Sequence, residues 1–345
     1  MSRLALTSLL ALALAACDES TPKAITAPDA SVQAAATVTK RDIGTLGGTN
    51  AYAMAINDSN QVAGHSDVNS TTHKAFIWKA GHYTVLPNLA GSQVSVANGI
   101  NSKGQVVGYV RITQIDFHAS LWRTPTTVQD LGTLGGPRSI AYAINTAGTV
   151  VGASDISQGR NAPFIWKNGT MSRLPTLGGP DDNAAFAINS TGVIVGQSET
   201  SLGKHRAVRW VNGVITDLGD LGGGMAFATG INDAGDIVGG SRLPNNQIHA
   251  FLIPHGGKMK DLGVLPGGVS SQATGINNQG QIVGFATTVA GPIHGFSWKN
   301  GVITDLGTLG GTFSQANGVN KNGKIAGFSH TAAIVNHGVV WTVSP

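Results

Sequence analysis

The chain has 345 residues, of which 41% are hydrophobic, 12% are charged and 48 are glycine. Its formal net charge of +4 is small for this length and forms no basic run, so we expect no nucleic-acid partner. The single cysteine, Cys17, excludes a disulfide within the chain, so packing must hold the fold together. The glycines recur periodically among apolar residues, which indicates a β-rich fold with tight turns.

The N-terminus has the pattern of an export signal. A positively charged start is followed by an apolar stretch at residues 4–16 that is too short to span a bilayer as a stable helix. The sequence Leu-Ala-Ala-Cys ending at Cys17 matches the bacterial lipoprotein box, in which the cysteine is lipidated and becomes the mature N-terminus. The alternative is an ordinary signal peptide with a chance cysteine.

We therefore expect a lipoprotein signal peptide at residues 1–16 and a lipidated Cys17 that anchors the protein to a membrane. Residues 17–36, rich in Ala, Ser, Thr and Pro, would form a flexible tether. The expected location is the bacterial cell envelope, on the periplasmic side or at the cell surface.

A motif centred on an asparagine recurs through the rest of the chain at a period of about 44 residues. We call these residues the anchor asparagines: Asn57, Asn101, Asn145, Asn189, Asn232, Asn277 and Asn320. Self-similarity at a fixed period of this length is typical of solenoids, arrays and propellers.

Residues around each anchor alternate in size with a period of two, which predicts a strand. Ala stands four residues before the anchor, Ala or Gly two before, and Ile or Val one before. A face made only of Ala and Gly suits a strand that packs closely on its neighbour near a crowded axis. Three residues after the anchor stands Gly, or Asn60 in the first repeat, as a turn with positive φ requires. Asn-x-x-Gly is therefore a predicted hairpin turn between two buried strands.

A third strand follows a variable polar loop and ends in tryptophan. All six tryptophans lie in this one column, and Ile253 takes the seventh place. We expect each to fill a seam between neighbouring units. Asn-Gly pairs then predict a further hairpin into a fourth strand, such as residues 302–306. Four short antiparallel strands per repeat predict a propeller blade, since β-helix coils are shorter and helical repeats have a 3.6-residue period.

We thus predict an all-β fold, a seven-bladed β-propeller of four-stranded blades over residues 37–345. The last repeat stops after its third strand, because Trp341 lies four residues before the C-terminal Pro345. Residues 38–44 match the missing fourth strand. The N-terminal strand should therefore complete the last blade and close the ring.

A His-Ala-Phe triplet at residues 249–251 begins the third strand of the fifth repeat. Together with Leu-Gly-Thr-Leu-Gly-Gly and Ile-Asn-x-x-Gly-x-Val-Val-Gly, it resembles the bacterial extracellular repeat family named for its His-Ala-Phe (HAF) motif, over residues 42–345. Other repeats depart from the triplet, for example the second, third and fourth. The resemblance implies an exported, β-rich repeat protein, here a lipoprotein member, and it implies no settled activity or catalytic residues.

The candidate chemistry is sparse. Four residues before the tryptophan column stand Lys74, His118, Ala162, Arg206, His249, His294 and His337. The four histidines and two cations of this column could form a metal or anion site. Blade spacing would keep them too far apart to share one metal, which favours a structural role in which each histidine bonds a loop backbone of its own blade. The Asn-Asp turns lack the full calcium-loop pattern, and the Gly-Gly loops lack a phosphate-binding lysine and suit close backbone approach between blades. We expect no metal and no cofactor, and we identify no catalytic residue.

We expect a monomeric binding module for a glycan or protein ligand. The predicted surface is the face built by the loops between second and third strands, where the sequence varies while the scaffold repeats. Its candidate ligand-binding residues, for which we infer no packing role, are Asp155, Arg160, Glu199, Lys204 and Arg242. One alternative is an envelope glycan lyase or hydrolase in the axial cleft, which would need carboxylates or a metal converging at the axis. Another is a purely structural adhesin.

Overall fold

The computed structural model describes residues 36–156, 160–289 and 291–344. Over these residues the regular secondary structure consists of 28 β-strands without a helix. The predicted signal peptide, the lipidation site Cys17 and nearly all of the predicted tether lie outside the described residues. No helical segment in the described part of the chain has the length and apolar character needed to cross a membrane.

Twenty of the strands form five four-stranded antiparallel sheets. The first two sheets contain β2 (Ala51–Ile56), β3 (Val62–Asp67), β4 (His73–Lys79) and β5 (His82–Val85), then β6 (Ser95–Ile100), β7 (Val106–Arg111), β8 (Phe117–Thr124) and β9 (Thr127–Asp130). The third contains β10 (Gly135–Ile144), β11 (Val150–Ile156), β12 (Asn161–Lys167) and β13 (Thr170–Arg173). The fourth and fifth contain β14 (Ala184–Ile188), β15 (Ile194–Glu199), β16 (His205–Val211) and β17 (Val214–Asp217), then β18 (Ala226–Ile231), β19 (Ile237–Arg242), β20 (Ile248–Ile253) and β21 (Lys260–Asp261).

The other eight strands are linked into one sheet. Its members are β22 (Ser271–Ile276), β23 (Ile282–Thr287), β24 (Ile293–Lys299), β25 (Val302–Asp305), β26 (Gly310–Val319), β27 (Lys324–Thr331), β28 (Asn336–Ser344) and β1 (Thr37–Gly44). A single parallel residue pair, Ile293 with Phe313, connects β24 to β26 because the ten-residue β26 begins early and runs beside β24. The N-terminal β1 pairs antiparallel with the C-terminal β28 along its whole length.

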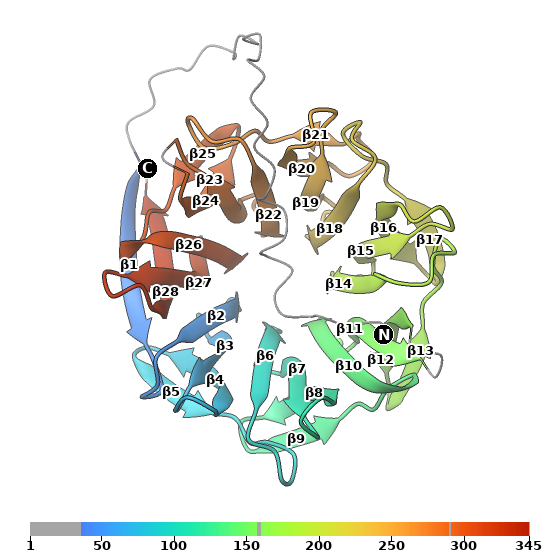
Figure 1. The fold of residues 1–345 in the computed structure, drawn as a ribbon, viewed down its shortest axis with the longest axis vertical. Helices are drawn as coiled ribbons and strands as arrows, with labels where there is room; N and C mark the ends of the chain where they lie inside the picture. Colours follow the sequence, from blue (N-terminus) through green and yellow to red (C-terminus); the bar gives the residue numbers. More distant parts are fainter. Residues whose placement is uncertain (1–35, 157–159, 290, 345) are drawn as a thin grey trace.

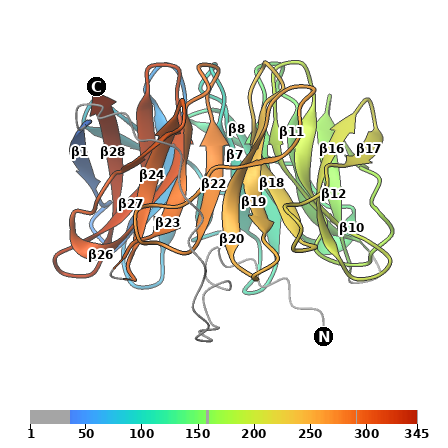
Figure 2. The same ribbon diagram turned by 90° about the horizontal axis from the view of Figure 1, so that it is seen from above.

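The sheets stand around a common central axis, with the first strand of each repeat innermost (Figure 1). Seen from the side, the connections gather at two opposite ends of the molecule (Figure 2). We call the end that carries the Asn-x-x-Gly turns the turn face. The end that carries the loops between second and third strands is the loop face; in an antiparallel sheet these two kinds of connection lie at opposite strand ends.

A β-bulge in the innermost strand explains the glycine found seven residues after every anchor. The register of β2 against β3 shifts between Ala53 and Ala55, and the corresponding shift recurs in the other repeats. A Cβ added at Gly64 would lie 2.0 Å from the carbonyl oxygen of Tyr52. Only glycine allows this approach of the second strand to the bulge.

The small residues two positions before the anchors lie where neighbouring sheets converge. A Cβ added at Gly230 would lie 3.2 Å from the Cα of Gly275 in the next sheet. One added at Gly318 would lie 3.6 Å from the Cα of Ala55. The predicted crowding near the axis is therefore confirmed.

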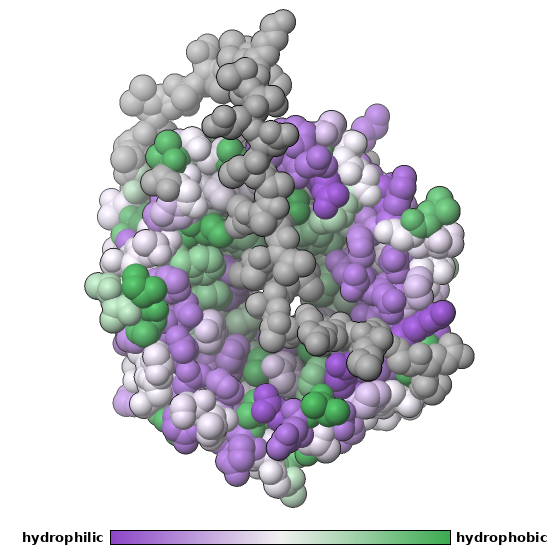
Figure 3. Space-filling view, in the orientation of Figure 1, coloured by the Kyte–Doolittle hydropathy of each residue, from purple (hydrophilic) through white to green (hydrophobic). Residues whose placement is uncertain are grey.

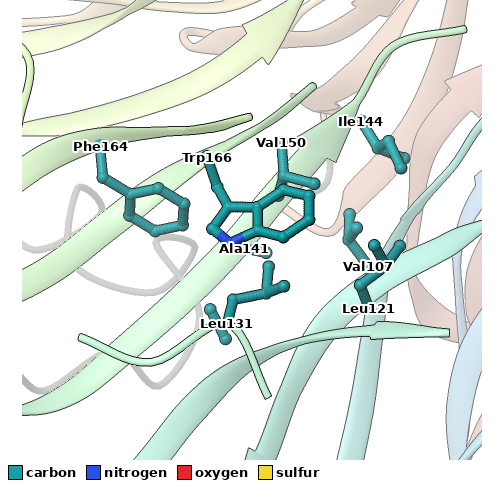
Figure 4. Packing of buried hydrophobic residues seen from close by; sticks show 9 residues of the cluster. Val107, Leu121, Leu131, Ala141, Ile144, Val150, Phe164 and Trp166 are labelled. Carbon is teal, nitrogen blue, oxygen red and sulfur yellow. The ribbon is translucent and has the colours of Figure 1, made fainter. Parts of the chain in front are cut away.

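The tryptophan column fills the seams between sheets, as predicted. Trp166 packs against Val150 of its own sheet and against Val107 and Leu121 of the preceding one (Figure 4). Trp78 packs in the same way against Val340 of β28. Burial of such large aromatic side chains supplies much of the hydrophobic stabilisation between neighbouring sheets.

Candidate functional site

The anchor asparagines form a continuous series of hydrogen bonds around the axis. The Nδ2 of Asn57 donates to the carbonyl oxygen of Asn101 at 3.0 Å. The equivalent bond leads from Asn101 to Asn145, Asn145 to Asn189, Asn189 to Asn232, Asn232 to Asn277 and Asn277 to Asn320. Asn320 then donates to the carbonyl oxygen of Asn57 at 3.0 Å, so the series returns to its start.

The other end of each anchor amide holds its own turn. The Oδ1 of Asn101 accepts hydrogen bonds from the backbone N–H groups of Lys103 and Gln105, both at 3.0 Å. The predicted positive φ at the turn is confirmed, with 84° at Gly148 and 58° at Asn60. Sequence reasoning found the turn but not the bond to the next sheet, for which the recurrence of Asn in every repeat was the signal.

An axial cavity of about 210 Å³ opens on the turn face and is lined by the anchor turns. Its polar collar consists of the residues that follow the anchors, namely Asp58, Ser102, Thr146, Ser190, Asp233, Asn278 and Lys321. One residue before the anchors, deeper along the strands, an apolar lining is provided by Ile144, Ile188, Ile231, Ile276 and Val319. The collar differs from repeat to repeat, whereas the anchor asparagine before it is constant and the residue before the anchor is always Ile or Val.

The two acids in the collar already bond to neighbouring turns. Asp233 accepts hydrogen bonds from the backbone N–H of Ser190 and the Nδ2 of Asn278, both at 2.9 Å. Burial by itself would raise the pKa of Asp233, but these hydrogen bonds outweigh it and lower the pKa. Asp58 accepts from the backbone N–H of Lys321 at 2.9 Å. The lowered pKa of Asp233 is the opposite of the raised pKa expected of a general acid.

The five residues predicted to bind a ligand lie at or near the loop face, opposite the cavity. Asp155 lies one residue before the end of β11, and its carboxylate is buried and accepts from the Nε of Arg138 at 2.8 Å. Burial raises the pKa of Asp155 despite the nearby arginine, which lowers it. The expectation that Asp155 has no packing role is therefore wrong, because it ties the first two strands of its sheet together.

The other four are distributed over three successive sheets. Glu199 accepts from the backbone N–H of Asp181 at 2.9 Å, and Arg242 reaches the sulfur of Met225 at 3.3 Å. Arg160 and Lys204 are exposed. No hydrogen bond or ion pair within the described residues joins any two of the five predicted residues, so the structure does not bring them into one cluster.

The Gly-Gly loops approach another backbone segment closely, as predicted, but that segment belongs to the same sheet and not to a neighbouring blade. A Cβ added at Gly48 would lie 2.6 Å from the backbone of Asp67, and the N–H of Gly48 donates to the carbonyl oxygen of Asp67 at 3.0 Å. Asp67 belongs to the sheet that the loop enters. The close approach therefore lies within one sheet, whereas we expected it between blades.

The histidine column pairs with carboxylates rather than with the loop backbone that we expected. The Nδ1 of His118 lies 2.8 Å from Asp130 of β9, and equivalent pairs are His249 with Asp261, His294 with Asp305 and His337 with Asp42, all at 2.8 Å. Arg206 pairs with Asp217 in the same way at 2.9 Å. Where Ala162 and Lys74 interrupt the column, Arg173 and Val85 stand in place of the acid.

These pairs join the third strand of a repeat to its fourth and have a structural role. Each acid also accepts a hydrogen bond from a glycine N–H two residues later, for example Gly263 to Asp261 at 2.7 Å. Burial opposes ionisation of Asp261, but the bonds from His249 and Gly263 prevail and lower its pKa. In the described part of the chain, no three His, Cys, Asp or Glu side chains are grouped as a metal site requires.

An aromatic and polar cluster occupies the seam between β2–β3 and β27–β28. Tyr52 stacks on His65 and meets Phe328 edge-on, with ring centroids 4.9 Å apart in both pairs. Its hydroxyl lies 3.1 Å from the Nδ2 of Asn336. The Nδ1 of His65 is buried without a hydrogen-bond partner in the described residues, and burial lowers the pKa of His65 to about 4. The repeat pattern gave no signal for this cluster, because equivalent positions elsewhere carry other side chains.

Solved structures support a β-propeller fold. The β-propeller domain of the Trilobed protease from Pyrococcus furiosus aligns over 85% of this chain and 93% of its own, with 9% identity and a TM-score of 0.56. The BP39L lectin from Burkholderia pseudomallei aligns over 90% of this chain and 96% of its own, with 9% identity and a TM-score of 0.52. TolB from Acinetobacter baumannii, at 14% identity and a TM-score of 0.46, aligns over 61% of this chain, which spans about half (53%) of TolB.

No protein-family model matches the sequence. No curated protein matches it either. The all-β architecture and the two longer alignments place the chain among β-propeller proteins in fold, while identities of 9% transfer no activity.

The anchor series can be tested with Asn145→Asp. This change keeps the Oδ1 that accepts from Thr149 but removes the donor to Asn189 and places a carboxylate against a carbonyl oxygen. We expect the free energy of unfolding to fall by about 3 kcal/mol, measured by urea denaturation. Thr146→Ala, at the exposed next position, should change it by no more than about 0.5 kcal/mol. Equal effects of the two changes would contradict a cohesive role for the anchor.

Acidification should lower the free energy of unfolding, because the buried His65 must be protonated. The pKa of His65 in the folded protein lies below its value in the unfolded chain. Its contribution to the free energy of unfolding is therefore complete above about pH 6.5 and is lost as the pH falls towards 4. Asp67 and His73 face it, and Asp67 only partly offsets the burial. Between pH 7 and pH 4.5, the wild type should lose roughly 2 to 3 kcal/mol more unfolding free energy than His65→Phe, which keeps a ring against Tyr52. Parallel pH profiles of the two proteins would refute this assignment.

Proposed function

We propose that this protein is a seven-bladed β-propeller, closed by its N-terminal strand, that acts as a binding module for a glycan or protein ligand. Closure is supported by the pairing of β1 with β28, from Thr37 with Ser344 to Gly44 with Gly338. It is also supported by the bond from Asn320 back to Asn57 and by the packing of Trp78 on Val340. The parallel bridge between β24 and β26 consists of one residue pair, so we assign these two strands to separate blades.

The observation that carries the binding role is the division between repeating and non-repeating side chains. The repeating columns are used for cohesion: the anchor amides bond between sheets, the tryptophans fill seams, and the histidines pair with carboxylates. The side chains that differ between repeats include those of the axial collar and of the loop face, at the two ends of the molecule. Varied side chains on a rigid repeated scaffold are typical of recognition surfaces.

Binding explains the site better than catalysis does. Hydrolysis or elimination on a glycan requires a carboxyl group with a suitably raised pKa near the reacting bond. The collar acids Asp58 and Asp233 are instead held by neighbouring backbone and amide groups. Hydrophilic and hydrophobic residues are mixed over the visible face of the molecule (Figure 3).

The sequence motifs support export and membrane attachment. On the lipoprotein box at Cys17 and the resemblance to the HAF repeat family, we place the protein in the bacterial cell envelope, with a lipid anchor and a tether before the first strand. Cys17→Ala should move the protein from the membrane fraction to the soluble fraction or leave it unprocessed. Unchanged fractionation with a different mature N-terminus would exclude this anchor.

Closure predicts unequal effects of two N-terminal deletions. Removing residues 18–36 should leave the melting temperature nearly unchanged, because the deletion stops before β1. Extending the deletion through Gly44 removes the partner of β28 and leaves an unpaired sheet edge, so it should lower the melting temperature and promote aggregation. Calorimetry and light scattering measure both effects. Identical melting of the two variants would show that β1 does not close the ring.

Ligand binding is tested by applying the purified protein to a glycan array and to solubilised envelope proteins. We expect saturable binding to a defined class of ligand. Weaker binding after alanine replacement of Arg160 and Lys204, the exposed cations of the loop face, at an unchanged melting temperature, would place the ligand on that face. Absence of saturable binding to either kind of ligand would favour the structural adhesin.

A further inference from the structure

We propose that the axial cavity of the turn face binds a single neutral sugar unit, such as the terminal residue of a glycan. This inference rests on the proposed binding function and assigns it a site and a ligand class. It also places that ligand opposite the loop face, where the sequence predicted the binding residues.

The size of the cavity limits the ligand to one small unit. Its volume of about 210 Å³ lies below the range of roughly 300–1,000 Å³ that is usual for sites of drug-sized ligands. The cavity opens on one end of the molecule among the anchor turns. A chain end can therefore enter it, with the remainder of the glycan left outside.

The lining has the two kinds of surface that a sugar ring presents. The apolar side chains before the anchors, such as Ile188 and Ile231, can pack against the C–H groups of the ring. The hydroxyls of Ser102, Thr146 and Ser190 lie in the collar and can both donate and accept hydrogen bonds with ring hydroxyls. The hydroxyls of Ser102 and Thr146 share one hydrogen bond at 3.3 Å, and each keeps further hydrogen-bonding capacity that a nonpolar ligand could not use.

The charges favour a neutral ligand over an acidic one. Two acids and one cation line the cavity: Asp58, Asp233 and Lys321. Hydrogen bonds keep the pKa of Asp233 low, so it remains ionised at neutral pH. The lining therefore carries a net negative charge, which opposes uronic acids and phosphorylated sugars.

The collar is held in place before any ligand arrives. Each collar residue follows an anchor whose amide is bonded to its own turn and to the next sheet, as at Asn101. Direct bonds also join collar residues, including Asp233 to Asn278 at 2.9 Å and Ser102 to Thr146 at 3.3 Å. Little ordering is left to occur on binding, so a small ligand can gain affinity from few contacts.

The inference is tested by blocking the cavity with Thr146→Trp. Thr146 is exposed and lines the cavity, whereas its exposed neighbour Ala147 in the same turn does not line it. Ala147→Trp is therefore the matched control for the size and hydrophobicity of the new side chain. Ser102→Trp blocks the cavity from another repeat and serves if Thr146→Trp fails to fold. Calorimetric or NMR titration with methyl glycosides of neutral hexoses, alongside glucuronic acid, measures binding.

We expect at least one neutral glycoside to bind the wild type and Ala147→Trp equally, and the blocked variants about tenfold or more weakly. Glucuronic acid should bind more weakly than its neutral counterpart. Equal binding by the wild type and a folded blocked variant would overturn the axial site but leave the binding function intact. Wild-type glycan binding that is lost only with Arg160 and Lys204 would move the site to the loop face. Absence of glycan binding in both assays would overturn the inference together with the glycan part of the proposed function.

Discussion

The side-chain amide of the anchor asparagine is the interaction on which the rest of this structure depends. One end of the amide fixes the turn between the first two strands of a repeat, and the other end bonds to the main chain of the next repeat. Local turn geometry and the position of the neighbouring sheet are thereby coupled in one buried group. A buried amide that lost either set of partners would carry an uncompensated desolvation cost, which explains why no other residue occupies the position.

The amide bonds span neighbouring sheets only because the sheets converge closely at the axis. Close convergence needs residues without large side chains, which Ala55 and Gly318 illustrate at the junction of the first and last repeats. The bulge in the innermost strand in turn requires a glycine opposite it, as at Gly64. The anchor asparagine, the small residue two positions before it and the glycine opposite the bulge therefore all reflect the close convergence of the sheets at the axis. The larger tryptophans fill the space that opens between the sheets further from the axis.

Departures from the repeat carry the individuality of the molecule. The collar residues differ from repeat to repeat, whereas the anchor asparagines beside them are the same in every repeat. The axial cavity is therefore asymmetric although the turns that line it repeat regularly. The junction of the first and last repeats has its own cluster, in which Tyr52 bridges to Asn336 and His65 is buried. Such a junction joins strands far apart in the sequence, so additional contacts there help to hold the two ends of the chain together.

The sequence by itself determined the strand pattern and the turn glycines, because each depends on residues a few positions apart. It also showed the repeat and the tryptophan column, because both recur along the chain at a fixed period. Period-two alternation and positive φ are local properties. Their recurrence in seven repeats allowed the positive φ at Gly148 and Asn60 to be predicted. Only the tertiary structure decided that the anchors bond to one another, that Asp155 is buried against Arg138, and that the cavity lies on the turn face. These features depend on how neighbouring strands and sheets are rotated and how closely they approach. A sequence pattern records which residues recur, whereas the distance between two of them is set by the packing of the whole ring.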